Sequence, residues 1–145
     1  IPQFNGVKPP FVNSEFEVLG VPSDNTFSSL DKDEGRYEVN SVEEMHHAFR
    51  TGSLRNVQYT KPYMHNGVFN SLEEVIDFYD AGGGQGRGLL VDNQTLSSDS
   101  LHLSKEEKEN LVLFMHALTE KIPFELLPSA LPHSHIKSLN TRKVG

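Results

Sequence analysis

Apolar residues recur with a helical period in three segments of the chain, and each segment starts with the same polar signature. A serine is followed three residues later by a glutamate at 41–44, 71–74 and 104–107. In such a capping box the serine side chain accepts a hydrogen bond from a free amide of the first helical turn, and the glutamate accepts one in return. The pattern predicts helices at 42–49, 71–81 and 104–119.

The two later segments carry the stronger apolar faces. The face of the second segment consists of Leu72, Val75, Ile76 and Tyr79, and that of the third of Leu111, Phe114, Met115 and Leu118. Both sets follow the 3.6-residue period of an amphipathic helix. Gly82–Gly84 end the second helix, because glycine readily takes the left-handed conformation that closes a helix. Pro123 lies beyond the end of the third helix.

The remaining chain shows neither a helical nor an alternating period. Residues 1–34 are rich in proline and glycine, and residues 82–100 read as one long loop. We therefore predict an all-α class with long irregular loops. Ordering so much irregular backbone costs conformational entropy, which favours a bound cofactor or metal that stabilises it.

Composition removes several classes of protein. The 145 residues fit one domain, and the longest apolar run, Leu111–Met115, is far shorter than the roughly 20 residues that cross a bilayer. The chain contains no cysteine, which excludes disulfides, thiolate metal sites and thioether attachment of haem c within it. A net charge of −7 argues against nucleic-acid binding and favours a basic protein partner.

The densest run of distinctive residues is R-T-G-S-L-R-N-V-Q-Y-T-K-P-Y-M-H-N-G at positions 50–67. It is similar to the run R-T-P-S-L-R-N-V-x-x-T-x-P-Y-M-H-D-G, which marks the second domain of di-haem cytochrome c peroxidases and their relatives. The resemblance continues through 71–83 and 107–119 and reaches back to 11–21. Three positions depart from it: Gly52 replaces a proline, Asn66 an aspartate, and Glu17 a common histidine.

The resemblance implies a fold and a place in a larger protein. Family members have two cytochrome c-like all-α domains, each with a haem c, and a calcium ion between them. Residues 1–145 then form a single, partial C-terminal domain of this kind, with a flexible tail at 133–145. The family's C-x-x-C-H motif directly precedes a segment like Ile1–Phe4, so we expect the chain to begin just after that motif.

The resemblance also implies a function. Hydrogen peroxide is reduced at the haem of the N-terminal domain, while the C-terminal haem accepts electrons from a small donor protein, a cytochrome c or a copper protein. The protein is expected to be periplasmic, because haem c is attached there. No catalytic residue is assigned to this chain, and the chain alone is expected to be inactive.

By the same resemblance, the cofactor-binding residues are Tyr79, His65 and Arg55, with His65 a neighbour of the haem and not a ligand, and the calcium ligands are the backbone carbonyls of Thr60 and Pro62. Tyr79 is the expected distal axial ligand of the C-terminal haem. The matching position is usually methionine in the peroxidases and tyrosine in a related oxidase that matures a tryptophan-derived quinone. From the residues alone Met64 remains an alternative ligand, since thioethers commonly bind haem iron, and Tyr79 remains an alternative core aromatic.

Two other functions remain open. One is a di-haem oxidase that acts on a protein substrate. The other is a haem-free interaction module that keeps the fold. Turnover of reduced cytochrome c with peroxide separates the first from a peroxidase, and the presence or absence of an encoded C-x-x-C-H motif decides the second.

Overall fold

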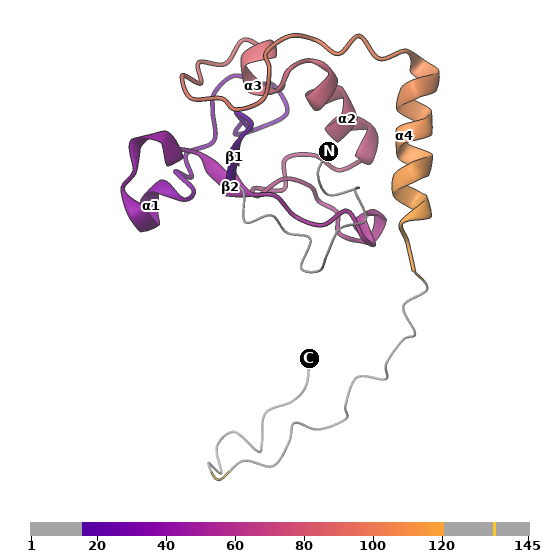
Figure 1. Cartoon of the computed structure of the whole chain (residues 1–145), viewed down its shortest axis with the longest axis horizontal. Coiled ribbons are helices and arrows are strands. Elements are labelled where there is room, and N and C mark those ends of the chain that lie inside the picture. The colour runs from indigo at the N-terminus through magenta and orange to yellow at the C-terminus, as the bar shows by residue number, and fades with distance from the viewer. Residues whose placement is uncertain (1–15, 121–134, 136–145) are drawn as a thin grey trace.

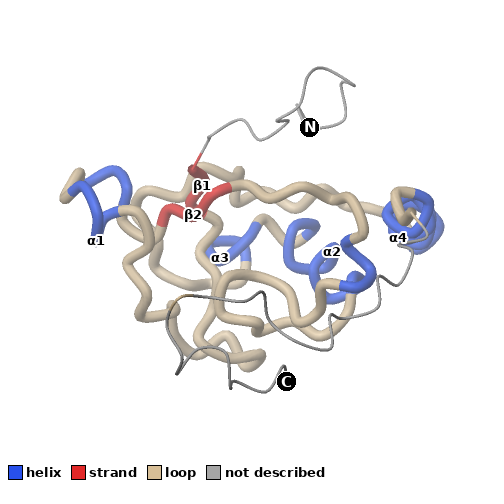
Figure 2. The backbone as a smooth tube through the Cα atoms, turned by 90° about the horizontal axis from the view of Figure 1, so that it is seen from below, coloured by secondary structure: helices blue, strands red, loops and turns tan. Residues whose placement is uncertain are grey.

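A computed structural model describes residues 16–120 and residue 135 (Figure 1). Its regular elements are, in chain order, β1 (Phe16–Val18), α1 (Tyr37–Asn40), η2 (Glu43–Met45), β2 (Ala48–Arg50), η3 (Val57–Tyr59), α2 (Leu72–Asp80), α3 (Gly83–Gly86) and α4 (Lys105–Ala117). The α1 and α4 helices lie at opposite ends of the molecule, with α2, α3 and the two strands between them (Figures 1 and 2). The predicted tail at 133–145 lies outside the described residues except for His135.

The predicted all-α class is wrong. Helices account for only 34% of the described residues, and β1 and β2 form an antiparallel two-stranded sheet. The register pairs Phe16 with Arg50, Glu17 with Phe49 and Val18 with Ala48. Three residues per strand are too few to show an alternating pattern in the sequence, so the sheet leaves no period from which it can be predicted.

The predictions for the second and third helices are confirmed. The Ser71 hydroxyl accepts a hydrogen bond from the Glu74 amide at 3.2 Å, and the Glu74 carboxylate accepts one from the Ser71 amide at 3.1 Å. Ser104 and Glu107 form the same reciprocal pair at the start of α4. Gly82 ends α2 with a φ of 88°, in the left-handed region that suits glycine.

The helix predicted at 42–49 is wrong. Ser41 does not begin a helix; it follows the single turn of α1 with a φ of 52°. The Asn40 side chain accepts a hydrogen bond from the Val42 amide at 3.2 Å, which satisfies the amide outside a helix. Only the short turn η2 forms, and the chain then enters β2. Neither α1 nor η2 contains a buried residue, and of the predicted apolar positions Val42 and Met45 only Met45 packs, partly buried, against the sheet cluster.

The core consists of three apolar clusters. The sheet cluster is Val18, Ala48, Leu89 and Val91; the α2–α4 cluster is Val57, Leu72, Ile76 and Met115; the aromatic cluster is Val21, Phe69 and Phe78. Because α2 contributes to both the second and the third cluster, it is the element that joins them. Phe78, fully buried at 0% exposure, is the side chain most enclosed by this arrangement.

The long loop predicted at 82–100 contains the single turn α3 and is closely packed. The backbone of Gly84 contacts that of Gly20, where a Cβ on Gly84 would lie 2.2 Å from the Gly20 carbonyl oxygen. The Gln94 side-chain amide donates to the carbonyls of Gly82 and Leu96 at 3.0 and 2.8 Å. Within residues 16–120, no helix is long and apolar enough to cross a membrane.

Candidate haem-binding site

The last turn of α2 carries Tyr79. Its ring meets the buried Phe78 ring edge-on, with centroids 6.0 Å apart, and 37% of the residue is exposed. No hydrogen bond joins its hydroxyl to another of the described residues. Desolvation, and secondly the Glu17 carboxylate, raise the pKa of the Tyr79 phenol above its ordinary value. Tyr79 is thus a partly exposed tyrosine in a desolvated setting, and its hydroxyl has no hydrogen-bond partner among the described residues.

The structure divides the predicted apolar face of α2. Leu72 and Ile76 pack in the α2–α4 cluster, whereas Val75 packs against the aromatic cluster. Leu72 and Ile76 are therefore covered by α4, through Met115 of that helix. Tyr79 belongs to neither cluster and keeps an exposed surface between them.

The loop at 63–69 brings Met64 to the same region. The ends of the loop are tied by an antiparallel bridge in which the Tyr63 amide donates to the Phe69 carbonyl at 2.7 Å. Met64 has a φ of 70°, a left-handed conformation that is uncommon for methionine, and it packs against the aromatic cluster. Met64 and Tyr79 therefore flank the same cluster, Met64 by packing on it and Tyr79 through its ring contact with Phe78.

His65 is held by a ring and a carboxylate. Its imidazole stacks on Phe49 with centroids 3.5 Å apart and an interplanar angle of 7°, and its Nε2 lies 3.3 Å from Asp31 Oδ1. Asn66 donates to the other Asp31 oxygen at 3.0 Å. Partial burial alone would raise the pKa of Asp31, but hydrogen bonds from Asn66, the Asp33 amide and His65 lower it. His65 thus occupies a fixed position with a side chain only 15% exposed.

The two-stranded sheet joins these parts. Phe49, whose ring stacks on that of His65, pairs across the sheet with Glu17. The negative charge of the Glu17 carboxylate adds to the desolvation that raises the pKa of Tyr79. Thr95 donates its hydroxyl to Glu17 at 2.5 Å and thereby fixes the carboxylate. Sequence reasoning assigned no role to Phe49 or Asp31. No local signal marks them, because each reaches His65 from a distant part of the chain.

Arg55 lies elsewhere. Its guanidinium pairs with Glu120, beyond the end of α4, at 3.5 Å, and both side chains are 71% exposed. The neighbouring Asn56 anchors the same segment, since its side chain accepts a hydrogen bond from the Glu120 amide at 2.8 Å. The structure thus places Arg55 beside the C-terminal end of α4.

Thr60 and Pro62 follow η3 on an exposed loop. The Thr60 hydroxyl donates to the Val57 carbonyl at 3.0 Å. Neither the Thr60 nor the Pro62 carbonyl oxygen accepts a hydrogen bond from the described residues, so both oxygens are free for a cation that prefers oxygen ligands. The described ranges contain no group of three or more acidic, histidine or cysteine side chains that could complete such a site.

Comparisons with known proteins find relatives that match most of the chain. The chain is 42% identical over 101 residues to the cytochrome-c peroxidase IdrP1 of Pseudomonas sp. strain SCT, covering 70% of the chain and 25% of that protein. It is 32% identical over 108 residues to the methylamine utilization protein MauG of Methylorubrum extorquens AM1, covering 74% of the chain and 28% of that protein. No protein-family model matches the chain.

The chain belongs to the di-haem cytochrome c peroxidase family. A solved structure agrees: the crystal structure of a MauG-like protein associated with microbial copper homeostasis matches with a TM-score of 0.54 and 26% identity, covering 74% of this chain and 33% of that one. The family member described here spans about a quarter of the length of the relatives it matches.

The residues around Tyr79 fit a haem. An axial ligand to haem iron needs an oxygen, nitrogen or sulfur donor that is not already bonded, and a tyrosine oxygen is one of the ligands that haem proteins use. The Tyr79 hydroxyl meets this requirement among the described residues, and Met64 offers a thioether beside the same aromatic cluster. Thioether attachment requires cysteine residues, which these 145 residues do not contain.

Proposed function

We propose that this chain forms the C-terminal haem domain of a di-haem peroxidase and passes electrons from a small donor protein to the N-terminal haem domain. There hydrogen peroxide takes up two electrons and two protons and yields two molecules of water. The observation that carries this proposal is the 42% identity to a cytochrome-c peroxidase over 70% of the chain. The cysteines of the haem c attachment motif must come from elsewhere in the polypeptide.

Within this domain Tyr79 is the proposed distal axial ligand of the haem. The bound haem supplies one-electron redox chemistry, and a phenolate oxygen stabilises ferric iron more than a thioether does. The chain positions Tyr79 through the end of α2 and its contact with Phe78. Met64, which packs against the aromatic cluster, is the alternative ligand, and His65 is the proposed neighbour of the haem. Arg55, whose guanidinium pairs with the exposed carboxylate of Glu120, is the remaining proposed cofactor-binding residue.

The carbonyl oxygens of Thr60 and Pro62 are the proposed contribution of this chain to a calcium site. Calcium takes six to eight oxygen ligands, so the other domain and water must supply the rest. This site would couple the loop before Met64 to the neighbouring domain. Addition of a chelator should lower the thermal stability of the complete protein, and readdition of calcium should restore it. A melting temperature that does not respond to chelator contradicts the site.

The acidic balance of the chain, −7 in total, supports a basic electron donor that associates in a salt-dependent manner. The proposed location is the periplasm, where haem c is attached. An association rate that is the same at low and high ionic strength contradicts the electrostatic part of this proposal.

Two observations favour a second function: the tyrosine at position 79 and the 32% identity to a MauG protein. In that case the complete protein is a di-haem oxidase that acts on a protein substrate. Turnover of reduced cytochrome c by peroxide distinguishes the two. Rapid, peroxide-dependent oxidation of the cytochrome supports the peroxidase, and its absence in a fully haem-loaded protein supports the oxidase. The 145-residue chain with added haem should show no such turnover.

A further inference from the structure

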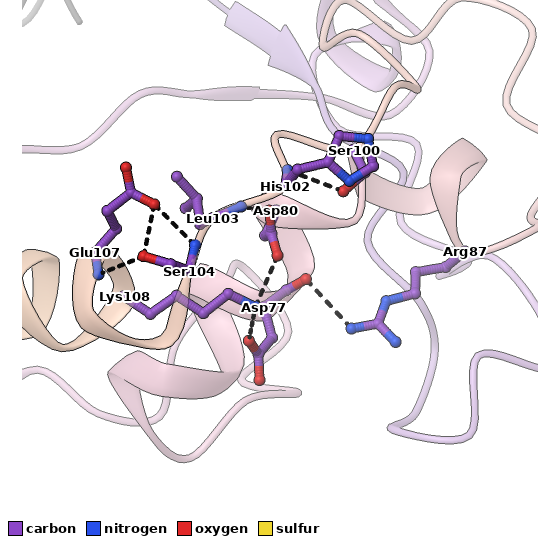
Figure 3. Close-up of polar contacts among 9 residues, drawn as sticks. All are labelled: Asp77, Asp80, Arg87, Ser100, His102, Leu103, Ser104, Glu107 and Lys108. Carbon is purple, nitrogen blue, oxygen red and sulfur yellow. Dashed lines mark hydrogen bonds and ion pairs between the residues drawn. The ribbon is translucent and has the colours of Figure 1, made fainter.

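The turn that carries Tyr79 is held by one lysine from the neighbouring helix. Lys108 of α4 places its Nζ 2.8 Å from Asp77 Oδ1 and 2.7 Å from Asp80 Oδ2 (Figure 3). Asp77 and Asp80 lie two positions before and one position after Tyr79. The lysine therefore ties both sides of the turn that carries the proposed ligand.

The Lys108–Asp80 ion pair is more enclosed than the Lys105–Glu109 pair of the same helix. The side chains of Lys108 and Asp80 are 30% and 14% exposed, whereas those of the Lys105–Glu109 pair are 91% and 62% exposed. Ion pairs on a fully exposed surface contribute little, because water screens them and the side chains lose entropy when they meet. Lys108 and Asp80 are partly shielded from water, so their contact restrains the turn more than the Lys105–Glu109 contact restrains its own helix.

Three further contacts hold the same turn. The Leu103 amide donates to Asp80 Oδ1 at 3.0 Å, so both oxygens of that carboxylate are used, and the Leu101 amide donates to the Asp80 carbonyl at 2.9 Å. Arg87 donates to the Asp77 carbonyl at 3.2 Å (Figure 3). Side chains and backbone from three segments thus fix the turn. Of these, Lys108 binds the side chains on both sides of Tyr79, Asp77 and Asp80.

We propose that Lys108 is a positioning residue, which holds the end of α2 so that Tyr79 points its oxygen at the haem iron. This inference rests on the proposed ligation by Tyr79. The Tyr79 hydroxyl has no hydrogen bond of its own to the described chain, so its direction depends on the backbone of its turn and on the edge contact with Phe78. Loss of Lys108 leaves Asp77 without its cation and Asp80 with the Leu103 amide alone.

The lysine is not needed to hold the two helices together. Leu72 and Ile76 of α2 pack with Met115 of α4 in a buried cluster that Lys108 does not enter. Replacement of Lys108 should therefore leave the helix pair assembled and release mainly the last turn of α2. For this reason a variant at Lys108 can fold and still lose the geometry of the ligand.

The test uses the complete, haem-loaded protein and compares Lys108→Met with Lys105→Met, a matched control one turn earlier on α4. The readouts are the tyrosinate bands in the resonance Raman spectrum of the ferric protein and the reduction potential of the haem in this domain. Lys108→Met should lower the ratio of tyrosine-ligated to unligated haem about fivefold, as expected for a partly shielded ion pair. The potential should rise, because ferric iron loses phenolate stabilisation. Lys105→Met should change neither readout.

Two conservative variants sharpen the result. Lys108→Arg should restore the bands, since it keeps the positive charge. Asp80→Asn should weaken them less than Lys108→Met, since the side-chain amide in that variant keeps an oxygen acceptor for the Leu103 amide. The positioning role is overturned if Tyr79→Phe abolishes the bands while Lys108→Met changes neither the bands nor the potential. It is also overturned if Lys108→Met lowers the melting temperature without changing the spectrum. If Tyr79→Phe leaves the bands intact, or if the parent protein shows none, the ligation fails and the positioning role fails with it.

Discussion

The helices α2 and α4 and the segment 33–47 contain the same serine–glutamate capping signature, but they have different structures. At Ser71 and Ser104 the signature opens a helix, whereas at Ser41 it follows a single helical turn. The difference lies in burial: α2 buries Leu72, Ile76 and Phe78, while Val39 and Val42 are 73% and 41% exposed. Since a short isolated helix is marginal in water, capping selects where a helix can begin and packing decides whether it forms.

The largest effect should come from removing the most buried ring of α2. Phe78→Ala should destabilise the protein by about 3–5 kcal/mol, through lost burial and the cavity left between Val21 and Phe69. Val39→Ala, at a position that is 73% exposed in α1, should change stability by less than about 0.5 kcal/mol. Denaturant unfolding of both variants is the measurement. Equal losses would contradict the role assigned to burial.

The caps themselves allow a direct comparison. Ser71→Ala should cost about 1 kcal/mol, because the Glu74 amide loses its acceptor at the start of α2. Ser41→Ala should cost less than about 0.5 kcal/mol, because the Ser41 side chain caps no helix. If Ser41→Ala destabilised as much as Ser71→Ala in thermal unfolding, a capped helix at 42–49 would have to form in solution.

Acid should weaken the α2–α4 junction without affecting segment 33–47 to the same degree. Hydrogen bonds from Lys108 first and from the Leu103 amide second lower the pKa of Asp80. A carboxyl group whose pKa falls on folding stabilises the native state above its ordinary pKa of about 4, and that contribution is lost as the pH falls toward the native value.

Amide hydrogen exchange measures this difference. The Leu103 amide donates to the titrating Asp80, and the Val42 amide to the non-titrating Asn40. Protection of Leu103 should decrease as the pH falls from about 6 to about 3, after correction for the intrinsic exchange rate, while protection of Val42 should stay constant. A parallel change at both amides would show that acid acts on the whole fold.

Both capped helices, α2 and α4, could be predicted from the sequence, because each combines a cap with a sustained apolar period. The sheet could not, since each strand has three residues and is defined by a partner in a distant part of the chain. Apolar period also overstated burial in α4: Met115 is 8% exposed, but Leu111 and Phe114 are 40% and 43% exposed. A periodic stripe indicates which face can be covered, and only the fold decides how much of it is.

The candidate site could be predicted in part. The resemblance brought His65 and Tyr79 forward, and general haem chemistry brought Met64 forward. In the structure Met64 and Tyr79 contact residues of the aromatic cluster, and His65 stacks on Phe49 of the sheet. The resemblance did not show that Arg55 pairs with Glu120, which lies beyond the end of α4. The sequence also could not show that Lys108 lies between Asp77 and Asp80. The contact joins two helices that are distant in the chain, and no sequence pattern indicates which of their residues meet.

The most direct test of the central claim is the resonance Raman spectrum of the complete ferric protein, recorded beside Tyr79→Phe and Met64→Leu. Ligation by Tyr79 predicts tyrosinate bands that Tyr79→Phe abolishes and Met64→Leu retains. A thioether-ligated spectrum that only Met64→Leu abolishes would contradict the account and assign the ligand to the loop at 63–69.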